Sequence, residues 1–422
     1  MSAASDSFLA PPTAPYDLVL SNARLINPAT GLDRIGSLAV RHGRIAAVGD
    51  LDPSVRVRRT IDVSGRIVCP GLIDLHSHIY EWVTNFGVNA DEAGIEVGVT
   101  TTVDQGSSGA WTFGGFNAYV IDPAQTDVRA FVSINVAGAL MGGMKGDILH
   151  NPTMASVEDV VRLAALHPYR LKGIKCHAES GALSHWGIEV LEMASAAGKE
   201  ANIPLYVHTG ELFPVVEANR PEARDVIKRM LHLLKPGDTL AHIYSSKPDG
   251  MIGDSETVPD VIYRALDAGV HFDIGHGLNF SYRIARMMLE AGVLPNTISS
   301  DIHGNFNAYH DMTQLDYSLC GSMTSLLALG MPLMEVLRRT THHPALVLGE
   351  ADDIGTLAVG SRADITVLDV LGGDWMMRDG QGEKMLVEER LIPHLVLRNG
   401  ELHTPSNRLL VDLLPASQRL PA

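Results

Sequence analysis

The sequence predicts an α/β protein, a (β/α)8 TIM barrel inserted in a small β-sandwich that the N- and C-terminal segments build together. Short β-rich runs, separated by glycine and asparagine turns, fill the first 70 residues and recur near the C-terminus. Between them, apolar runs alternate with stretches of helical composition over about 270 residues, the usual size of such a barrel. We therefore expect the N-terminal half of the β-sandwich at 1–70, the barrel at 71–345, and the C-terminal half of the β-sandwich with a polar tail at 346–422.

The eight barrel strands are expected where short β-rich runs end in polar residues. Helical composition, for example at 156–166 and 187–201, separates these runs. An open, doubly wound sheet is the alternative, but no Gly-x-Gly-x-x-Gly motif follows the first strand, which disfavours it. The eight predicted strands span 72–78, 101–106, 130–135, 171–178, 204–210, 239–244, 271–276 and 297–303.

Composition narrows the classes of partner. The chain has 422 residues, 45% hydrophobic and 19% charged, and a net charge of −16, so no nucleic-acid partner is expected, because phosphate binding needs a basic surface. No run of about 18 apolar residues is present, so no membrane span is expected. The three scattered cysteines and the absence of a signal peptide at the start predict a cytoplasmic protein without a disulfide framework.

The segment 70–78 reads PGLIDLHSH, an apolar run that ends in His-x-His. Side chains alternate along a strand with period 2, so His76 and His78 point to the same side. Two imidazoles that project together from a strand end are a good start for a divalent-metal site. Two ordinary strand histidines are the structural alternative for this motif taken alone.

More polar residues recur at the ends of the later strands, where a TIM barrel places its chemistry. Their joint presence on five or more strands favours a site for a pair of metal ions over coincidence, because imidazoles and an acidic oxygen suit zinc-like ions. These candidates are Lys175 and His177 on strand four, His208 on five, His242 on six, His276 on seven, and Asp301 and His303 on eight.

Lys175 needs its own explanation, because an ammonium group cannot bind a metal. A buried lysine loses its proton easily, and the neutral amine can add carbon dioxide to form a carbamate that bridges two cations. An ordinary salt-bridged lysine is the alternative. Lys172 lies three residues earlier and should face the other side of the strand.

These motifs together resemble the amidohydrolase superfamily. They are PGLIDLHSH, GIKCHAE, YVHTGE, TLAHIY and SSDIHG, in this order, with flanking β segments LVLSNARLINPATG and GTLAVGSRADITVLD that look like the superfamily's β-sandwich halves. The resemblance covers nearly the whole chain. A lysine on strand four and the SSDIHG loop look most like the deacetylase-type members, which are related to dihydroorotases and hydantoinases.

The resemblance implies a ligand set and a mechanism. His76 and His78 would hold the first metal ion, His208 and His242 the second, and carboxylated Lys175 would bridge the two ions, which are expected to be zinc. Asp301 would contact the first metal and act as general base and acid, while a metal-bridging hydroxide attacks the substrate carbonyl. We expect a small-molecule substrate and a homo-oligomer.

Departures from the relatives bear on the substrate. Dihydroorotases have an arginine two residues after the His-x-His, where this chain has Tyr80, so dihydroorotate is not the expected substrate. His177 stands two residues past Lys175, where deacetylase-type relatives often have a basic residue. We expect His177 and His276 to contact the substrate; for His276 a strand-seven core residue is the equal alternative.

The sequence therefore predicts a binuclear metal-dependent hydrolase that cleaves an amide or ester bond, deacylating an N-acyl amino acid or an O-acyl hydroxy acid; cyclic amides remain open. One alternative is a mononuclear purine- or pyrimidine-type deaminase, because His208 and Glu211 form the His-x-x-Glu motif that such enzymes use for proton transfer. Lys175 argues against it. A non-enzymatic relative is the other alternative, and the filled ligand positions argue against that.

Overall fold

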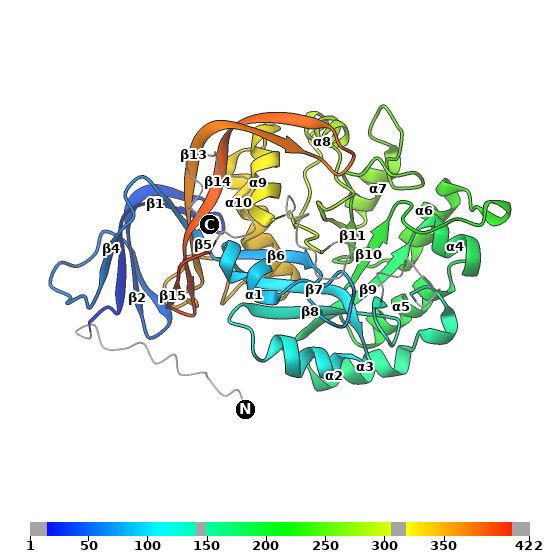
Figure 1. Cartoon of the computed structure of the whole chain (residues 1–422), viewed down its shortest axis with the longest axis horizontal. Coiled ribbons are helices and arrows are strands. Elements are labelled where there is room, and N and C mark those ends of the chain that lie inside the picture. The colour runs from blue at the N-terminus through cyan, green and yellow to red at the C-terminus, as the bar shows by residue number, and fades with distance from the viewer. Residues whose placement is uncertain (1–14, 141–148, 305–317, 407–422) are drawn as a thin grey trace.

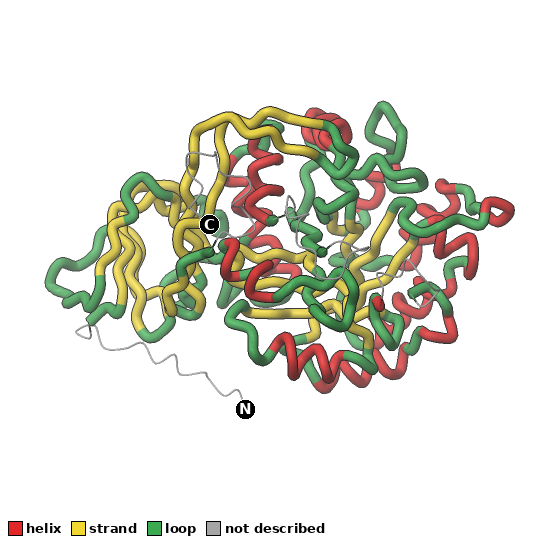
Figure 2. Tube along the Cα trace, in the orientation of Figure 1, coloured by secondary structure: helices red, strands yellow, loops and turns green. Residues whose placement is uncertain are grey.

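The computed structural model describes residues 15–140, 149–304 and 318–406 of the chain. A sheet of strands from both termini lies beside a larger unit in which helices surround a curled sheet (Figure 1; Figure 2). The predicted fold class, a (β/α) barrel joined to a β domain built from both ends of the chain, is confirmed. The exact boundaries at residues 70 and 345 stay predictions.

Seven parallel strands form the curled sheet, in the order β12-β11-β10-β9-β8-β7-β6. Each strand pairs with the next one along the chain, as successive βα units of a barrel require. The strands are β6 (Leu72–Ser77), β7 (Val99–Gly109), β8 (Asp127–Ser133), β9 (Leu171–Ala178), β10 (Leu205–Thr209), β11 (Thr239–Ala241) and β12 (His271–Phe272).

The segment predicted as the eighth strand closes the barrel, because its backbone is hydrogen-bonded to both neighbouring segments. On one side Ile274 N donates to Thr297 O at 3.2 Å, and on the other His78 N donates to Ile302 O at 3.0 Å. The segment is nevertheless not a regular strand, and it forms only isolated bridges, Asp273 with Thr297 and Ser77 with Ile302.

Positive backbone angles explain why both the seventh and the eighth segments are irregular near their ends. Gly275, Gly277 and Asp301 have φ values of 46°, 30° and 52°, which a pleated strand cannot contain. The prediction of regular strands over 271–276 and 297–303 is therefore wrong in this detail, although both segments lie where the barrel needs them.

Helices cover the outside of the curled sheet (Figure 2). Their starts follow local capping rules; the Ser156 side chain, for example, accepts a hydrogen bond from Asp159 N at 3.2 Å at the start of α3. The helices are α1 (Ala90–Ala93), α2 (Phe113–Phe116), α3 (Val157–Leu166), α4 (Ser180–Trp186), α5 (Glu189–Glu200), α6 (Ala223–Leu233), α7 (Asp260–Asp267), α8 (Tyr282–Glu290), α9 (Leu319–Ala328), α10 (Leu333–Thr340) and α11 (His342–Val347). No helix in the described ranges is both long and apolar enough to cross a membrane.

The strands of the two termini form one mixed sheet in the order β15-β14-β13-β5-β1-β2-β3, with β4 beside β1. Strands from both ends of this order, such as β2 and β14, share one apolar core, so the sheet must curl around it. The strands are β1 (Leu18–Asn27), β2 (Leu32–Arg41), β3 (Arg44–Gly49), β4 (Thr60–Asp62), β5 (Ile67–Pro70), β13 (Ile365–Arg378), β14 (Lys384–Arg398) and β15 (Glu401–His403).

A buried network of charges joins this sheet to the barrel. Arg129, on β8, is fully buried and donates to Asp127 at 2.5 Å and to Glu350 at 2.9 Å. Arg362, just before β13, pairs with the same Asp127 at 2.9 Å. Lys172 forms an ion pair with Glu350 at 2.8 Å, so it belongs to this network and not to the predicted metal site.

We expect Arg129→Met to lower the free energy of unfolding by about 3–5 kcal/mol, because it removes a buried charge that pairs with both Asp127 and Glu350. Equilibrium unfolding in denaturant measures this value. The matched control is Arg24→Met, which removes the 2.7 Å pair with Asp33, whose side chains are 46% and 38% exposed; this loss should be about 0–1 kcal/mol. Equal effects of the two substitutions would contradict the importance of the buried network.

Candidate active site

A cavity opens at the carboxyl ends of the barrel strands. Eight of the nine candidate residues named from the sequence lie in its lining, and His276 does not. The lining consists of His76, His78, Phe86, Gln105, Gly106, Ala139, Leu149, Lys175, His177, His208, Leu212, His242, Leu278, Asn279, Asp301 and His303.

Strand register explains how β9 and β10 contribute to this cavity. Lys175 pairs with Tyr206, and His177 pairs with His208, two residues further along both strands. Residues i and i+2 share one side of a strand, so all four side chains point into the barrel.

His242 and Asp301 are not placed by strand alternation, because their backbone is left-handed, with φ values of 61° and 52°. Such outliers are costly for residues other than glycine and concentrate at functional sites.

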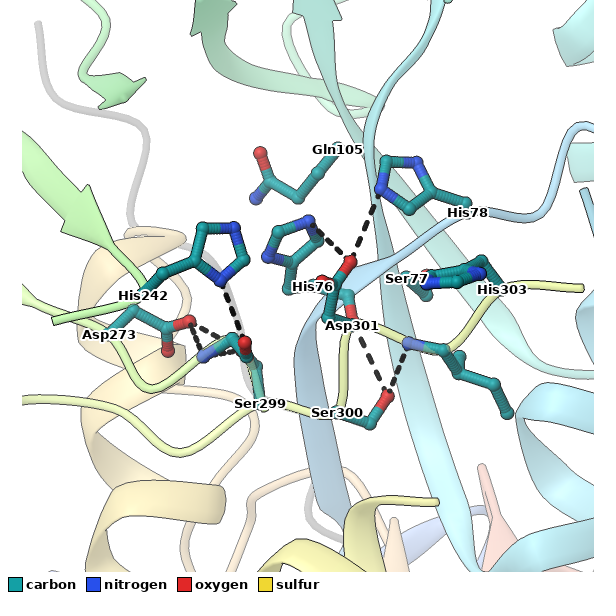
Figure 3. Close-up of polar contacts among 12 residues, drawn as sticks. His76, Ser77, His78, Gln105, His242, Asp273, Ser299, Ser300, Asp301 and His303 are labelled. Atoms are coloured by element: carbon teal, nitrogen blue, oxygen red, sulfur yellow. Dashed lines mark hydrogen bonds and ion pairs between the residues drawn. The ribbon is translucent and has the colours of Figure 1, made fainter. Parts of the chain in front are cut away.

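Asp301 lies at the centre of the site, between the two histidines of the His-x-His motif (Figure 3). Its Oδ1 atom is 3.1 Å from His76 Nε2 and 3.4 Å from His78 Nε2. One ligand atom from each of His76, His242 and Asp301 lies within 4.8 Å of the others, and all three residues are buried. This is the spacing of side chains that could hold one cation.

The Nδ1 atoms of four site histidines have hydrogen-bond partners behind the site. His242 Nδ1 is 2.7 Å from Gly275 O, and His303 Nδ1 is 2.7 Å from Gly304 O. His78 Nδ1 lies 3.1 Å from Ser107 Oγ, and His76 Nδ1 lies 3.0 Å from the Tyr206 hydroxyl. A carbonyl oxygen can only accept, so His242 and His303 carry a proton on Nδ1 and keep the Nε2 lone pair available to a metal.

The Tyr206 hydroxyl is itself held by a buried carboxylate. It donates to Asp273 Oδ2 at 2.5 Å, and Gly275 N donates to the same oxygen at 2.8 Å. Thr297 and Ser299 also donate to Asp273 through their hydroxyl groups. The orientation of His76 is therefore fixed by a chain of polar groups that runs across three barrel segments.

Lys175 is 3% exposed and lies with its Nζ 4.7 Å from the centre of the Tyr206 ring. Burial lowers the pKa of its amine to about 8, because a low-dielectric surrounding disfavours the charged form. Burial likewise lowers the pKa of His208 well below its ordinary value and that of His242 to about 4. Burial thus favours the neutral form of His208 and His242, which is the form that binds a metal.

Three glycines leave room for these side chains. A Cβ atom on Gly106 would lie 2.7 Å from Lys175 Cγ, and one on Gly275 would lie 2.6 Å from His242 Nδ1. A Cβ atom on Gly277 would come too close to the Asp301 carboxylate. All three glycines also have positive φ values, so any other residue would be strained there.

His208 and His242 form a second group beside the first. Their ring centroids are 4.4 Å apart, and His177 is 5.2 Å from His208. His208 Nε2 is buried and has no hydrogen-bond partner among the described residues. A buried nitrogen without a partner is unfavourable unless a ligand completes it, so this atom fits a metal site.

Two residues singled out from the sequence lie away from the cavity. His276 is buried and stacks on Phe280, with ring centroids 4.4 Å apart, which fits its core alternative better than a substrate contact. The Glu211 carboxylate accepts a hydrogen bond from Arg220 at 3.0 Å and does not line the cavity.

Other residues of the site carry no signal that the sequence analysis recognised. Gln105 and Asn279 line the cavity and are 1% and 4% exposed, but neither belongs to a metal-binding motif. Tyr206 and Asp273 lie on predicted strands, at the i−2 position relative to His208 and Gly275. An inward-facing polar residue two positions before a ligand is the pattern that could have pointed to Tyr206.

Comparison with known proteins agrees with this geometry. A deacetylase from Brucella anthropi is 30% identical over 371 residues, which cover 87% of this chain and 88% of the relative. The crystal structure of a dihydroorotase matches with a TM-score of 0.78 and 28% identity, covering 92% of this chain and 97% of that one. The crystal structure of an adenine deaminase matches with a TM-score of 0.79 and 26% identity, covering 92% and 100%.

The amidohydrolase family matches residues 67–402, a range that contains the whole barrel and every residue of the cavity. With the barrel, the histidines at its strand ends and Asp301 between them, this match shows that the chain is an enzyme of the amidohydrolase family.

Proposed function

We propose that this enzyme is a binuclear metal-dependent hydrolase that removes an acyl group from an N-acyl amino acid or an O-acyl hydroxy acid. The observation that carries the proposal is a set of imidazoles around Asp301 whose Nδ1 atoms are hydrogen-bonded behind the site: His76, His78 and His242. The deacetylase name of the relative from Brucella anthropi supports the choice of an acyl substrate.

The ligand set fits two cations. His76, His78 and Asp301 would hold the first, and His208 and His242 the second. Lys175, buried in the lining of the same cavity, would bridge both as a carbamate. The unpartnered, buried Nε2 of His208 and the approach of His242 to His76 and Asp301, all within 4.8 Å, support two adjacent cation positions with His242 next to both. When bound, two such ions polarise a substrate carbonyl and lower the pKa of a water molecule to near neutrality.

Asp301 would move the proton. Its carboxylate, held by the backbone hydrogen bond from Asp301 N to His76 O at 2.8 Å, would take a proton from the attacking water and give it to the leaving amine or alcohol. His177, which lies in the cavity lining beside His208, would orient the substrate. The surrounding burial keeps bulk water from competing for these contacts.

The deaminase alternative has less support. It needs Glu211 to reach the substrate, but this carboxylate is paired with Arg220 outside the cavity lining. The fold similarity to an adenine deaminase does not distinguish the two, since one fold carries many reactions. The non-enzymatic alternative does not fit a chain in which all six predicted ligand positions are filled and buried or half-buried.

Zinc as the metal, a homo-oligomeric state and a cytoplasmic location remain predictions from the sequence. The function itself is tested with enzyme loaded with zinc and bicarbonate and offered N-acetyl amino acids, O-acetyl hydroxy acids, cyclic amides and adenine. We expect release of acetate or another small acid, and close to two metal ions per chain in elemental analysis. Ammonia release from adenine with one ion per chain would support the deaminase instead.

We expect Lys175→Ala to lose bound metal and nearly all turnover, because the bridging ligand is absent. Added short carboxylic acids should restore some of both by occupying the vacated space. Metal content and hydrolysis rate are measured together.

The control for Lys175 is Lys172→Ala, on the same strand but paired with Glu350, which should keep both metal and turnover. Full metal content in the Lys175 variant without added acid would contradict the bridging role.

We expect Asp301→Asn to lower kcat by roughly 10²–10⁴-fold, the usual contribution of a positioned acid–base group, while metal is largely retained. The amide keeps one ligand oxygen and the shape of the side chain but cannot accept the proton. Glu211→Gln is the comparison and should have a mild effect. If Glu211→Gln abolishes activity with both metals bound, the proposed roles of Asp301 and Glu211 are wrong.

A further inference from the structure

The terminal sheet reaches the active site through a long hairpin. Strands β13 and β14 extend from the sheet across the barrel, and their connecting turn, residues 379–383, ends beside the start of α8 (Figure 1). The segment in contact with this turn is 278–282, which follows barrel strand seven. Residues more than 90 positions apart in the sequence therefore meet beside the cavity.

Several hydrogen bonds fix the turn to this segment. Gly380 N donates to Phe280 O at 2.9 Å, and Gln381 Nε2 donates to Leu278 O at 3.1 Å. The Asp379 carboxylate accepts from Tyr282 N at 2.9 Å, at the first residue of α8. Asp379 also accepts from the backbone of its own turn, from Gln381 N at 2.9 Å, so the carboxylate holds the turn and the barrel segment together.

Packing at Gly380 is closer than any side chain allows. A Cβ atom there would lie 2.4 Å from Leu278 C and O and 2.9 Å from Asn279 N. These are backbone atoms, which cannot rotate away as a flexible side chain would. Gly380 has no positive φ, so this contact, and not backbone strain, is what another residue would disturb.

The segment that Gly380 contacts is part of the cavity. Leu278 and Asn279 both line it. Asn279 is 4% exposed, and its Oδ1 has no hydrogen-bond partner in the part of the chain that the structure describes. A buried acceptor of this kind favours a ligand that supplies a donor, because leaving it unpaired costs about 1–3 kcal/mol.

We propose that the turn 379–383 of the terminal sheet is a positioning element that determines where Asn279 lies in the substrate cavity. Gly380 would be the residue that determines how closely the turn approaches Leu278 and Asn279. This inference rests on the proposed function only in taking the ligand to be the acyl substrate. Asn279 would accept a hydrogen bond from an N–H or O–H group of that substrate, on the part that does not react. The terminal sheet thus contributes to substrate selection without contacting the substrate.

The test compares Gly380→Ala with Gly372→Ala in the zinc-loaded, full-length enzyme. Gly372 lies on the same hairpin, has no positive φ, and a Cβ there would meet nothing within 4 Å. We expect Gly380→Ala to raise KM by about tenfold with kcat changed by less than about threefold, the sign of a lost contact that binds substrate and transition state equally. Metal content should equal that of the parent, and Gly372→Ala should behave as the parent in all three measurements.

A double-mutant cycle with Asn279→Ala identifies the residue through which the turn acts. If Gly380 works by placing Asn279, its substitution should add little to KM once Asn279 is removed, because coupled changes are not additive. Fully additive effects, equal behaviour of the two glycine variants, or loss of metal in Gly380→Ala would each overturn the proposal.

Hydrogen exchange separates this inference from the proposed function. Peptides that cover 278–282 should exchange faster in Gly380→Ala than in Gly372→Ala, whichever substrate the enzyme uses. If the parent hydrolyses no acyl compound, the proposed function fails while faster exchange still supports the positioning contact. Unchanged exchange in Gly380→Ala would overturn the contact even in an active hydrolase.

Discussion

The closure of the barrel between its first strand and its last segment is the contact on which the site depends. Asp301 N donates to His76 O at 2.8 Å, and Ser300 N donates to the buried Asp74 carboxylate at 3.0 Å. These bonds bring Asp301 between His76 and His78, more than 200 positions away in the sequence. Residues so far apart in the sequence meet here because the intervening βα units bring the last segment back to the first strand, so the site depends on closure of the barrel.

The site also depends on polar groups that are not themselves proposed metal ligands or substrate contacts. A cluster of neutral imidazoles in a buried cavity is unfavourable unless each ring is oriented and its far nitrogen is paired. Tyr206, Asp273 and the carbonyl of Gly275 supply those partners for His76 and His242. The glycines at 106, 275 and 277 allow the backbone to approach closely enough for this arrangement. Pre-organisation of this kind places the Nε2 atoms before any ion arrives.

The sequence predicts those features of the site that follow from local rules. Period 2 along a strand places His76 beside His78 and Lys175 beside His177, and the barrel rule places them at one face. Features that depend on contacts between distant segments are not predictable in this way. The Tyr206–Asp273 hydrogen bond and the packing of Gly380 on Leu278 join segments far apart in the sequence, whose relative position only the fold defines. The direction of the His276 side chain is likewise not predictable from strand alternation. The positive φ values of Gly275 and Gly277, on either side of it, interrupt the regular alternation of side chains along a strand.

The terminal sheet holds the barrel at two places with different physical properties. At the amino ends of the strands, Asp127 and Arg129 join the charged groups around Arg362, a buried network whose geometry resists change because each charge needs its partner. Near the cavity, the contact consists of backbone hydrogen bonds and one glycine. The first contact fixes the position of the sheet relative to the barrel. Strands β13 and β14 belong to that sheet, so fixing the sheet also fixes the turn at the end of the hairpin. In the proposed arrangement, the distance between this turn and the cavity-lining segment 278–282 therefore depends on the buried charges at the opposite end of the barrel.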